Sequence, residues 1–316
     1  MGLTGFLFPG QGSQYVGMGK ALHDAFPQAR DWFGEGEESA GLPLRKLCFQ
    51  GPDDDLRKTE ITQPAILLVS VIAWRLLEQR GAVPDFVAGH SLGEYSALVA
   101  AGSVPFPDAL RTVRSRGRFM QEAVPAGEGA MAAVLGMERQ QVEKICREFA
   151  AGRVVSAANF NGAGQIVISG HKDAVERVSH QAREQGARRV VPIPVSAPFH
   201  CALMTPARDR LVPELDRLPF QDLAFPLLTN VDAVPIRTGD QAREALKRQV
   251  TSPVRWEESL RAMIQSGVTT FVEVGPGKVL STLARRLQKD LRIHRVEDPE
   301  SLDATCRALQ YNRGGE

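Results

Sequence analysis

The chain has 316 residues, of which 43% are hydrophobic and 24% are charged, and its formal net charge at pH 7 is +1. This length and composition predict a globular protein made of one large domain or two ordinary ones. A net charge so close to zero does not favour binding to nucleic acid or to an anionic membrane, and neither is expected as a partner.

The cysteines and the apolar segments narrow the class of protein further. The four cysteines are scattered and form no C-x-x-C pair. This spacing argues against a metal site or a disulfide framework and suits a reducing compartment. No charged segment precedes an apolar run at the N-terminus, and the apolar run 65–77 is too short to span a bilayer. We therefore expect a cytoplasmic protein.

The first predicted strand, residues 5–8, leads into a glycine-rich loop at 9–19. The loop lacks the spacing of a phosphate-binding loop, because Tyr15 stands where the third glycine is needed. Two interpretations remain: a backbone that approaches a ligand closely, with Gln11 presenting its amide at the strand end, or a flexible turn. Further on, 62–64 predict the start of a buried helix that continues over 65–77.

The segment Gly89-His90-Ser91-Leu92-Gly93 lies between a predicted strand at 86–88 and a predicted helix at 94–101, which Gly102 ends. A G-x-S-x-G sequence in this context is typical of a nucleophile elbow, in which a sharp turn exposes the serine hydroxyl. The N–H of Leu92 then points toward a developing oxyanion. Two glycines around a serine also occur in ordinary turns, but the context favours Ser91 as a nucleophile.

A helix predicted from residue 107 carries four arginines: Arg111, Arg114, Arg116 and Arg118. Such a cationic run is usually a solvated face, and we expect this of three of them. One arginine is left as a candidate to face the site.

The pattern changes between residues 125 and 195. We predict strands at 129–135, 154–158, 165–169 and 189–194, helices at 138–150 and 173–185, and a turn at 159–164. The order β-α-β-β-α-β is that of a ferredoxin-like unit. We therefore expect 125–195 to be an inserted α+β subdomain, and 1–124 with 196–316 to form a large α/β domain.

The C-terminal part returns to alternating strands and helices. We predict strands at 225–229 and 269–274, helices at 240–250, 256–265 and 279–288, and a loosely held tail after residue 298. Together with the N-terminal elements this predicts a mostly parallel sheet covered on both faces. His200, at the predicted start of a helix running through Met204, is the leading candidate for a base, although a lone histidine is more often structural.

A serine hydroxyl needs a neighbouring base, and histidine has a suitable pKa near neutral pH. In the α/β-hydrolase order an aspartate stands between serine and histidine in the chain. No aspartate stands out at a strand end between Ser91 and His200. This indicates a Ser–His dyad whose imidazole is oriented by a group other than a carboxylate. An acyl-serine would form. The residue pattern leaves open whether water hydrolyses this ester or a second nucleophile takes the acyl group from it.

Six motifs of the chain resemble those of the malonyl-CoA:acyl-carrier-protein transacylases of fatty acid synthesis and the acyltransferases of polyketide synthases, and the resemblance covers residues from about 3 to 290. They are Phe8-Pro9-Gly10-Gln11-Gly12-Ser13-Gln14, Gly89-His90-Ser91-Leu92-Gly93-Glu94-Tyr95, Arg116-Gly117-Arg118-Phe119-Met120-Gln121, Asn159-Phe160-Asn161, Pro198-Phe199-His200 and Glu273-Val274-Gly275-Pro276-Gly277.

The resemblance implies a ping-pong transfer without a permanently bound cofactor. Ser91 takes the malonyl group of malonyl-CoA with His200 as base, then passes it to the phosphopantetheine thiol of an acyl carrier protein. The matching oxyanion-hole positions are Gln11 and Leu92. A backbone carbonyl near Gln249 would hold the histidine, and Arg116 would bind the free malonyl carboxylate through two parallel hydrogen bonds.

The remaining expectations concern specificity and assembly. Phe199 would crowd a 2-methyl branch, which favours malonyl over methylmalonyl. Asn159, Asn161 and Arg189 are candidates for the cleft that receives coenzyme A, and a monomer is expected.

Two other classes of function compete. A thioester hydrolase acting on carrier proteins is disfavoured by Arg116, since a site for uncharged acyl chains would not bury a cation. A non-catalytic docking subunit would leave Ser91 unacylated.

Overall fold

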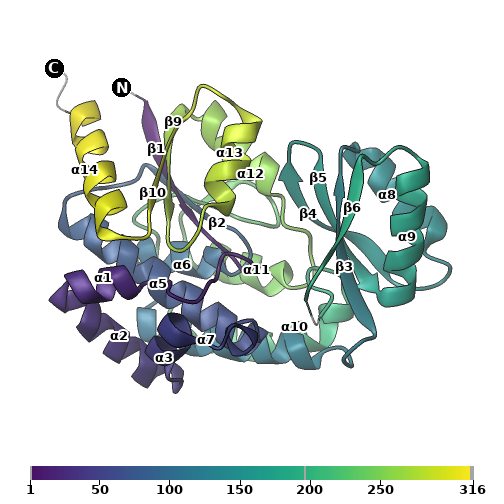
Figure 1. The fold of residues 1–316 in the computed structure, drawn as a ribbon, viewed down its shortest axis with the longest axis horizontal. Helices are drawn as coiled ribbons and strands as arrows, with labels where there is room; N and C mark the ends of the chain where they lie inside the picture. Colours follow the sequence, from purple (N-terminus) through teal and green to yellow (C-terminus); the bar gives the residue numbers. More distant parts are fainter. Residues whose placement is uncertain (1, 196, 314–316) are drawn as a thin grey trace.

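The computed structural model describes residues 2–195 and 197–313, and its helices and strands build two lobes, each around its own sheet (Figure 1). The six-stranded sheet has the order β10-β9-β1-β2-β7-β8. β8 runs antiparallel to β7, and the other neighbours are parallel, which confirms the mostly parallel sheet. Its strands are β1 (Leu3–Phe8), β2 (Phe86–Gly89), β7 (Leu227–Leu228), β8 (Pro235–Ile236), β9 (Val268–Val274) and β10 (Arg292–Val296).

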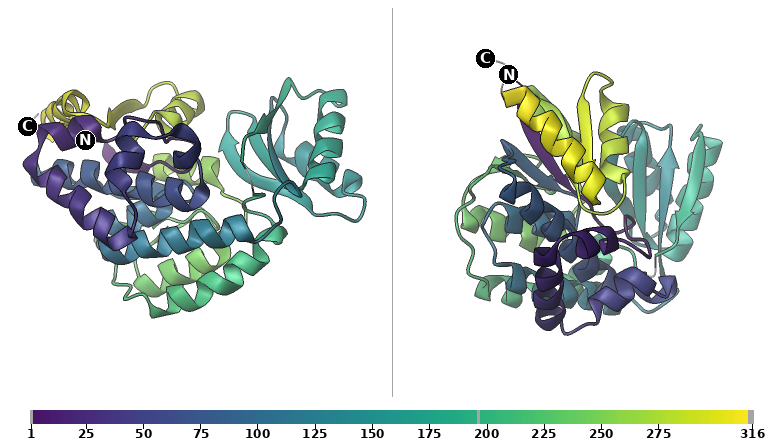
Figure 2. Two further views of the ribbon diagram at one scale, coloured as in Figure 1. Left: turned by 60° about the horizontal axis from the view of Figure 1, so that its bottom comes forward. Right: turned by 60° about the vertical axis from the view of Figure 1, so that its left-hand side comes forward.

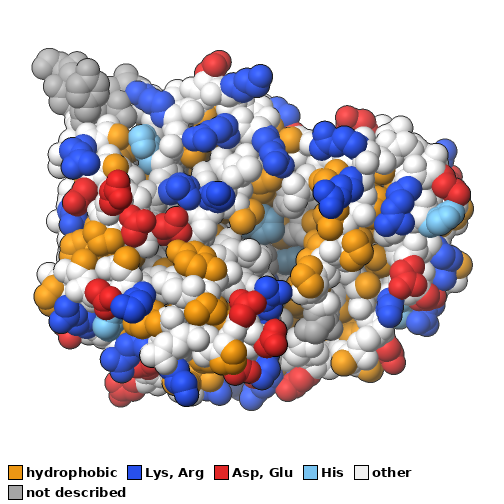
Figure 3. Space-filling model, in the orientation of Figure 1, with side chains coloured by type: hydrophobic (Ala, Val, Ile, Leu, Met, Phe, Trp, Pro, Cys, Tyr) orange, Lys and Arg blue, Asp and Glu red, His pale blue; other side chains and the backbone are white. Residues whose placement is uncertain are grey.

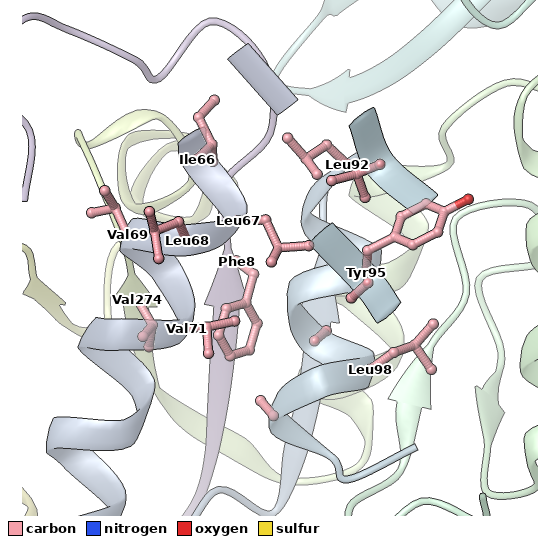
Figure 4. Close-up of a cluster of buried hydrophobic side chains, with 14 of the residues drawn as sticks. Phe8, Ile66, Leu67, Leu68, Val69, Val71, Leu92, Tyr95, Leu98 and Val274 are labelled. Atoms are coloured by element: carbon pink, nitrogen blue, oxygen red, sulfur yellow. The ribbon is translucent and has the colours of Figure 1, made fainter. Parts of the chain in front are cut away.

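Alternating side chains of β1 enter two different cores, because successive residues of a strand point to opposite faces. Phe6 and Phe8 pack in the core that contains α5 (Thr59–Gln79), α6 (Gly93–Ala100) and α7 (Phe106–Glu122). Leu7 packs on the other face against α12 (Trp256–Gln265) and α13 (Val279–Leu287). Figure 4 shows Phe8 beside Leu67 and Val71 of α5, with α6 alongside. Helices therefore cover both faces, as the sequence predicts.

Helix α5 begins at Thr59, three residues before the predicted start, and carries Pro64 inside it. Among the described residues it is the one helix that is long and apolar enough to cross a membrane, and 83% of its most apolar window is buried inside the protein. A helix that is apolar all round and packed in this way belongs to the core.

Two parts of the large lobe differ from the prediction. Four helices precede α5 and were not predicted: α1 (Lys20–Ala25), α2 (Pro27–Ala40), α3 (Leu44–Gln50) and α4 (Asp53–Leu56). The loose tail predicted after residue 298 is wrong, because these residues form α14 (Pro299–Arg313), which packs against β10, an edge strand that was not predicted either. Leu302, Cys306 and Leu309 are buried, which anchors α14.

The smaller lobe consists of a four-stranded sheet with the order β4-β5-β3-β6, in which all neighbours are antiparallel. Its hydrophobic core is separate from the cores of the large lobe. In Figure 2 this lobe projects to one side of the large one. Its elements in chain order are β3 (Gly129–Leu135), α8 (Arg139–Phe149), β4 (Val155–Gly162), β5 (Gln165–His171), α9 (Lys172–Glu184) and β6 (Arg189–Ile193).

The turn predicted at 159–164 is too long, since Asn159–Gly162 belong to β4. Contact with the large lobe extends the strand: Asn159 forms a bridge to Val254, and Phe160 N donates to Val254 O at 2.9 Å. Strand β4 thereby joins the two lobes.

The chain returns to the large lobe through a turn at His200 rather than through a helix start. His200 has φ 59°, and only a short 3-10 helix, Ala202–Met204, precedes α10 (Thr205–Arg217). The remaining helix, α11 (Gly239–Gln249), lies within one residue of its predicted bounds.

Candidate active site

Ser91 occupies the sharp turn between β2 and α6 with φ 51°. The flanking glycines are required by space: a Cβ on Gly89 would lie 1.9 Å from the carbonyl of Gly93, and a Cβ on Gly93 would lie 2.0 Å from Phe8 O. The G-x-S-x-G sequence therefore lets the turn pack against itself and against β1, so that the strained serine stands at the carboxyl end of the sheet.

Asn230 holds this turn from both sides. Its Oδ1 accepts from Ser91 N at 2.7 Å, and its Nδ2 donates to Gly89 O at 2.7 Å. Sequence reasoning missed Asn230, although it follows a predicted strand directly and so comes to the same edge of the sheet as Ser91.

The side chains of Ser91 and His200 meet, with Oγ and Nε2 2.7 Å apart. Behind the ring, Nδ1 lies 2.9 Å from Gln249 O and 3.2 Å from Ser252 O. Since carbonyl oxygens only accept, Nδ1 carries the proton and Nε2 is left to accept one from Ser91. No carboxylate of the described residues bonds this ring.

Burial lowers the pKa of His200 to about 3, and the nearby charge of Arg116 acts in the same direction. The imidazole is therefore neutral at physiological pH, which is the form that can take a proton from the serine hydroxyl.

Arg116 is the one of the four arginines of α7 that reaches this site, and its side chain is 1% exposed. It donates from Nη1 to Gln63 Oε1 at 2.8 Å, and from Nη2 to Gln249 Oε1 at 2.8 Å and to Ser91 Oγ at 3.1 Å. All of these acceptors are neutral. Burial lowers the pKa of the guanidinium, because it disfavours the charged form. No described carboxylate forms an ion pair with the guanidinium to offset this cost.

Arg111 and Arg118 are exposed, and Arg114 donates to Ala40 O at 2.6 Å. Of the four arginines, Arg116 therefore faces the site, which agrees with the expectation that one arginine of this helix does so.

A cavity of about 190 Å³ opens beside Ser91, between the two lobes. Figure 3 shows this hollow with histidine surface at its floor. The residues that line it from the large lobe include Gln11, His90, Phe199 and Leu280, and those from the small lobe include Met131, Asn159, Asn161, Val167 and Ile193.

Of the three residues predicted for the cleft, two line the cavity and one does not. Asn159 and Asn161 line the cavity, and Asn161 Oδ1 lies 3.0 Å from His90 Nε2. Arg189 is exposed at the start of β6 and is not among the residues that line the cavity.

Gln11 and Leu92 are the residues predicted to supply the oxyanion-hole N–H groups. Gln11 shares the cavity with Ser91, and its side-chain amide lies 3.4 Å from Thr59 Oγ1. Within the described chain, the backbone N–H groups of Gln11 and Leu92 donate to no other protein group. Both groups are available to an oxygen that forms beside Ser91.

Residues 5–302 match the family model for the acyl transferase domain. The chain belongs to this family. It is 47% identical over 314 residues to the malonyl CoA-acyl carrier protein transacylase of Bacillus subtilis, a match that covers 98% of each chain. The relative of the same name from Escherichia coli strain K12 is also 47% identical, over 95% of this chain and 97% of its own.

Solved structures agree with these sequence relatives. The malonyl CoA-acyl carrier protein transacylase of Coxiella burnetii superimposes with a TM-score of 0.95 at 39% identity and 98% coverage of both chains. A malonyl-transacylase in complex with a type II PKS acyl-carrier protein gives a TM-score of 0.95 at 43% identity, covering 97% of this chain and 99% of that one. The family resemblance read from the motifs is confirmed, and the chain is an acyltransferase.

Proposed function

We propose that the chain transfers the malonyl group of malonyl-CoA to the phosphopantetheine thiol of an acyl carrier protein. Ser91 holds the malonyl group as an ester between the two half-reactions. One observation carries the proposal: a buried guanidinium with only neutral partners lies 3.1 Å from the Ser91 hydroxyl. An acyl group on Ser91 that ends in a carboxylate supplies the missing counter-charge.

In the first half-reaction Ser91 Oγ attacks the thioester carbon of malonyl-CoA. The Oγ proton passes to His200 Nε2, which lies 2.7 Å away. The oxyanion forms where the backbone N–H groups of Gln11 and Leu92 can donate. When the oxyanion collapses, the carbon–sulfur bond breaks, the coenzyme A thiolate takes the proton from His200, and malonyl-serine remains.

The second half-reaction reverses these roles. The carrier thiol gives its proton to His200 Nε2, and the thiolate attacks the ester carbon of malonyl-serine. The carbon–oxygen bond breaks, and Oγ takes the proton back from His200. Atoms and protons balance over the cycle, because one thiol is released for each thiol consumed.

The carbonyls of Gln249 and Ser252 orient the ring throughout. They stabilise the imidazolium that forms in each half-reaction while adding no negative charge.

We assign the choice of acyl group to Arg116 and Phe199. An acetyl group leaves the guanidinium without a charged partner, whereas a malonyl carboxylate accepts two parallel hydrogen bonds from it. Phe199 lines the cavity and leaves less room for a 2-methyl branch than a small residue would.

We place coenzyme A and the carrier arm in the cavity beside Asn159 and Asn161, between a large domain at 1–124 and 196–316 and an inserted ferredoxin-like subdomain at 125–195. Arg189 remains a weaker candidate for contact with either thioester, outside the cavity lining. The relatives' names support the carrier protein as partner in fatty acid or polyketide synthesis. We propose that the chain works as a cytoplasmic monomer.

The test is acylation followed by intact mass. The protein is mixed with malonyl-CoA, the added malonyl mass is located on Ser91, and carrier protein is then added. Transfer to the carrier supports the proposal, and Ser91→Ala should acquire no mass. Loss of the adduct to water without transfer would instead identify a thioester hydrolase, and the absence of an adduct on the unmodified chain would identify a docking subunit.

A further inference from the structure

Glu94, in the first turn of α6, is a buried acid beside the site, and it has no part in the proposed transfer of the malonyl group. It is 1% exposed, and no described residue forms an ion pair with it. Its Oε2 accepts from Gln249 Nε2 at 2.6 Å, and its Oε1 accepts from Asn230 N at 3.4 Å. An unpaired carboxylate is expensive to bury, so its presence beside the site calls for a function.

Gln249 connects this carboxylate to the reacting residues, and its side chain is 0% exposed. The amide Nε2 donates both to Glu94 Oε2 at 2.6 Å and to Ser91 O at 2.9 Å. The amide Oε1 then faces away from Glu94 and accepts from Arg116 Nη2 at 2.8 Å.

Ionised Glu94 permits only this orientation of the Gln249 amide, since a carboxylate accepts and cannot donate. In the opposite orientation Oε1 would face two acceptors, Glu94 and Ser91 O, and Nε2 would face the Arg116 donor. Each of these contacts would be repulsive in a site closed to water. The carboxylate makes the shortest of the three contacts that hold Gln249 with its oxygen toward Arg116.

We propose that Glu94 is a positioning residue that, through the Gln249 amide, holds the Arg116 guanidinium toward the acyl group on Ser91 and so maintains selection for acyl groups that end in a carboxylate. The proposal rests on the proposed function, because it concerns the cation that selects malonyl there. Glu94 itself touches neither substrate nor the reacting atoms.

The protonation state of Glu94 makes this role dependent on pH. Burial raises the pKa of Glu94 to about 7, although the hydrogen bond from Gln249 and the charge of Arg116 act in the opposite direction. The other charged or titratable groups that face it are Asp232, Arg248 and Tyr95. Protonated Glu94 carries no charge and can donate to the Gln249 oxygen, so the shortest of the contacts that orient the amide is weakened, and Gln249 and Arg116 are held less firmly below that pH.

The experiment compares Glu94→Gln with wild type. Glutamine has nearly the shape of glutamate and reproduces the donor of the protonated acid. The readout is the ratio of Ser91 acylation rates with malonyl-CoA and with acetyl-CoA, measured by rapid quench and intact mass from about pH 5.5 to about pH 8.5. The ratio cancels changes in the Ser91–His200 chemistry that both substrates share, and the malonyl carboxylate stays ionised throughout.

A matched control removes a different buried carboxylate. Glu273 is buried and caps the start of α13 by accepting from Leu280 N at 2.9 Å and Ser281 N at 2.8 Å. Glu273→Gln should lower stability and leave the malonyl:acetyl ratio and its pH dependence as in wild type.

We expect the wild-type ratio to fall about tenfold or more as the pH drops through about 7, and Glu94→Gln to show the low ratio at every pH, as expected for a displaced binding group. A variant ratio equal to that of wild type across the range, or a wild-type ratio that is flat with pH, would overturn the proposal. If Glu94→Gln does not fold, the wild-type profile decides alone. Failure of the proposed function looks different, since wild type would then acquire no malonyl group or lose it only to water.

Discussion

Replacing Arg116 by alanine removes the cation on which malonyl selection depends in the proposed mechanism. In the free protein its three hydrogen bonds go to Gln63, Gln249 and Ser91, none of which is charged. The substitution therefore breaks no ion pair among the described residues, and the loss specific to malonyl is the contact with the incoming carboxylate.

The size of the loss in malonyl acylation follows from the two parallel hydrogen bonds between the guanidinium and the malonyl carboxylate. Each hydrogen bond between a guanidinium and a carboxylate contributes about 1.5–3 kcal/mol, and two parallel bonds contribute about 3–6 kcal/mol. At about 1.4 kcal/mol for each factor of ten, malonyl acylation of Ser91 in Arg116→Ala should fall at least about 100-fold. Acetyl acylation should hold or rise, because an acetyl group has no carboxylate to bind.

The assay is the rate of Ser91 acylation with each thioester under single-turnover conditions. Arg118→Ala is the matched control, since Arg118 lies on the same helix but is exposed, and its malonyl:acetyl ratio should equal that of wild type. Equal losses for malonyl and acetyl in Arg116→Ala would show that Arg116 serves the fold rather than selection, and the reasoning would be refuted.

Three further predictions follow from the contacts around the site and the core. Asn230→Ala removes both side-chain bonds that hold the elbow, so the free energy of unfolding should fall by about 2–4 kcal/mol in denaturant, with acylation by both thioesters reduced alike. Leu302→Ala should lower the free energy of unfolding by about 2–5 kcal/mol and leave acylation unchanged, because Leu302 is buried in α14 and is not among the residues that line the cavity beside Ser91. The folded pKa of His200 is lowered to about 3, so the unfolded chain, with a pKa of about 6.5, takes up the proton first. The stabilising contribution of neutral His200 is therefore complete above about pH 6.5 and is lost as the pH falls toward about 3. Unfolding midpoints measured against pH should show this loss in wild type and not in His200→Ala.

The elements nearest the site were the most predictable from the sequence. The elbow could be recognised because its geometry leaves no room for a side chain at Gly89 or Gly93, so the fold requires the glycines that the pattern detects. In the small lobe the order of strands and helices was predicted in full and most of their bounds to within one or two residues, because the elements are short and regular and glycines separate several of them.

The errors have physical reasons of their own. The four helices before α5 are short or contain glycine, and they owe their stability to packing on one another and on longer helices such as α5 rather than to a strong local pattern. Helix α14 did carry a signal: Leu302, Cys306 and Leu309 recur at helical spacing and lie on its buried face. Strand β4 extends past its predicted end because Val254 pairs with it, and no local pattern contains that contact.

Within the site, sequence reasoning predicted Ser91, His200 and Arg116, whose side chains meet in the structure, and missed most of the residues that hold them. The contacts of Asn230 and Glu94 join segments more than a hundred residues apart, so their partners could not be read from spacing. Both are polar residues near the carboxyl end of a predicted strand, which is the position where such side chains gather in a parallel sheet.

The backbone carbonyls behind His200 and the neutral partners of Arg116 have one effect in common: they leave the guanidinium without a carboxylate partner in the free protein. A carboxylate placed behind the imidazole would lie close to a guanidinium that already approaches Ser91 Oγ at 3.1 Å, and the two would pair. The cation would then be neutralised before any acyl group arrived. The protein instead orients the ring with the carbonyls of Gln249 and Ser252 and keeps its acid, Glu94, on the far side of the Gln249 amide. In the proposed mechanism the amide carries the influence of that negative charge to Arg116 as an oriented dipole, and the guanidinium keeps its charge for the acyl carboxylate.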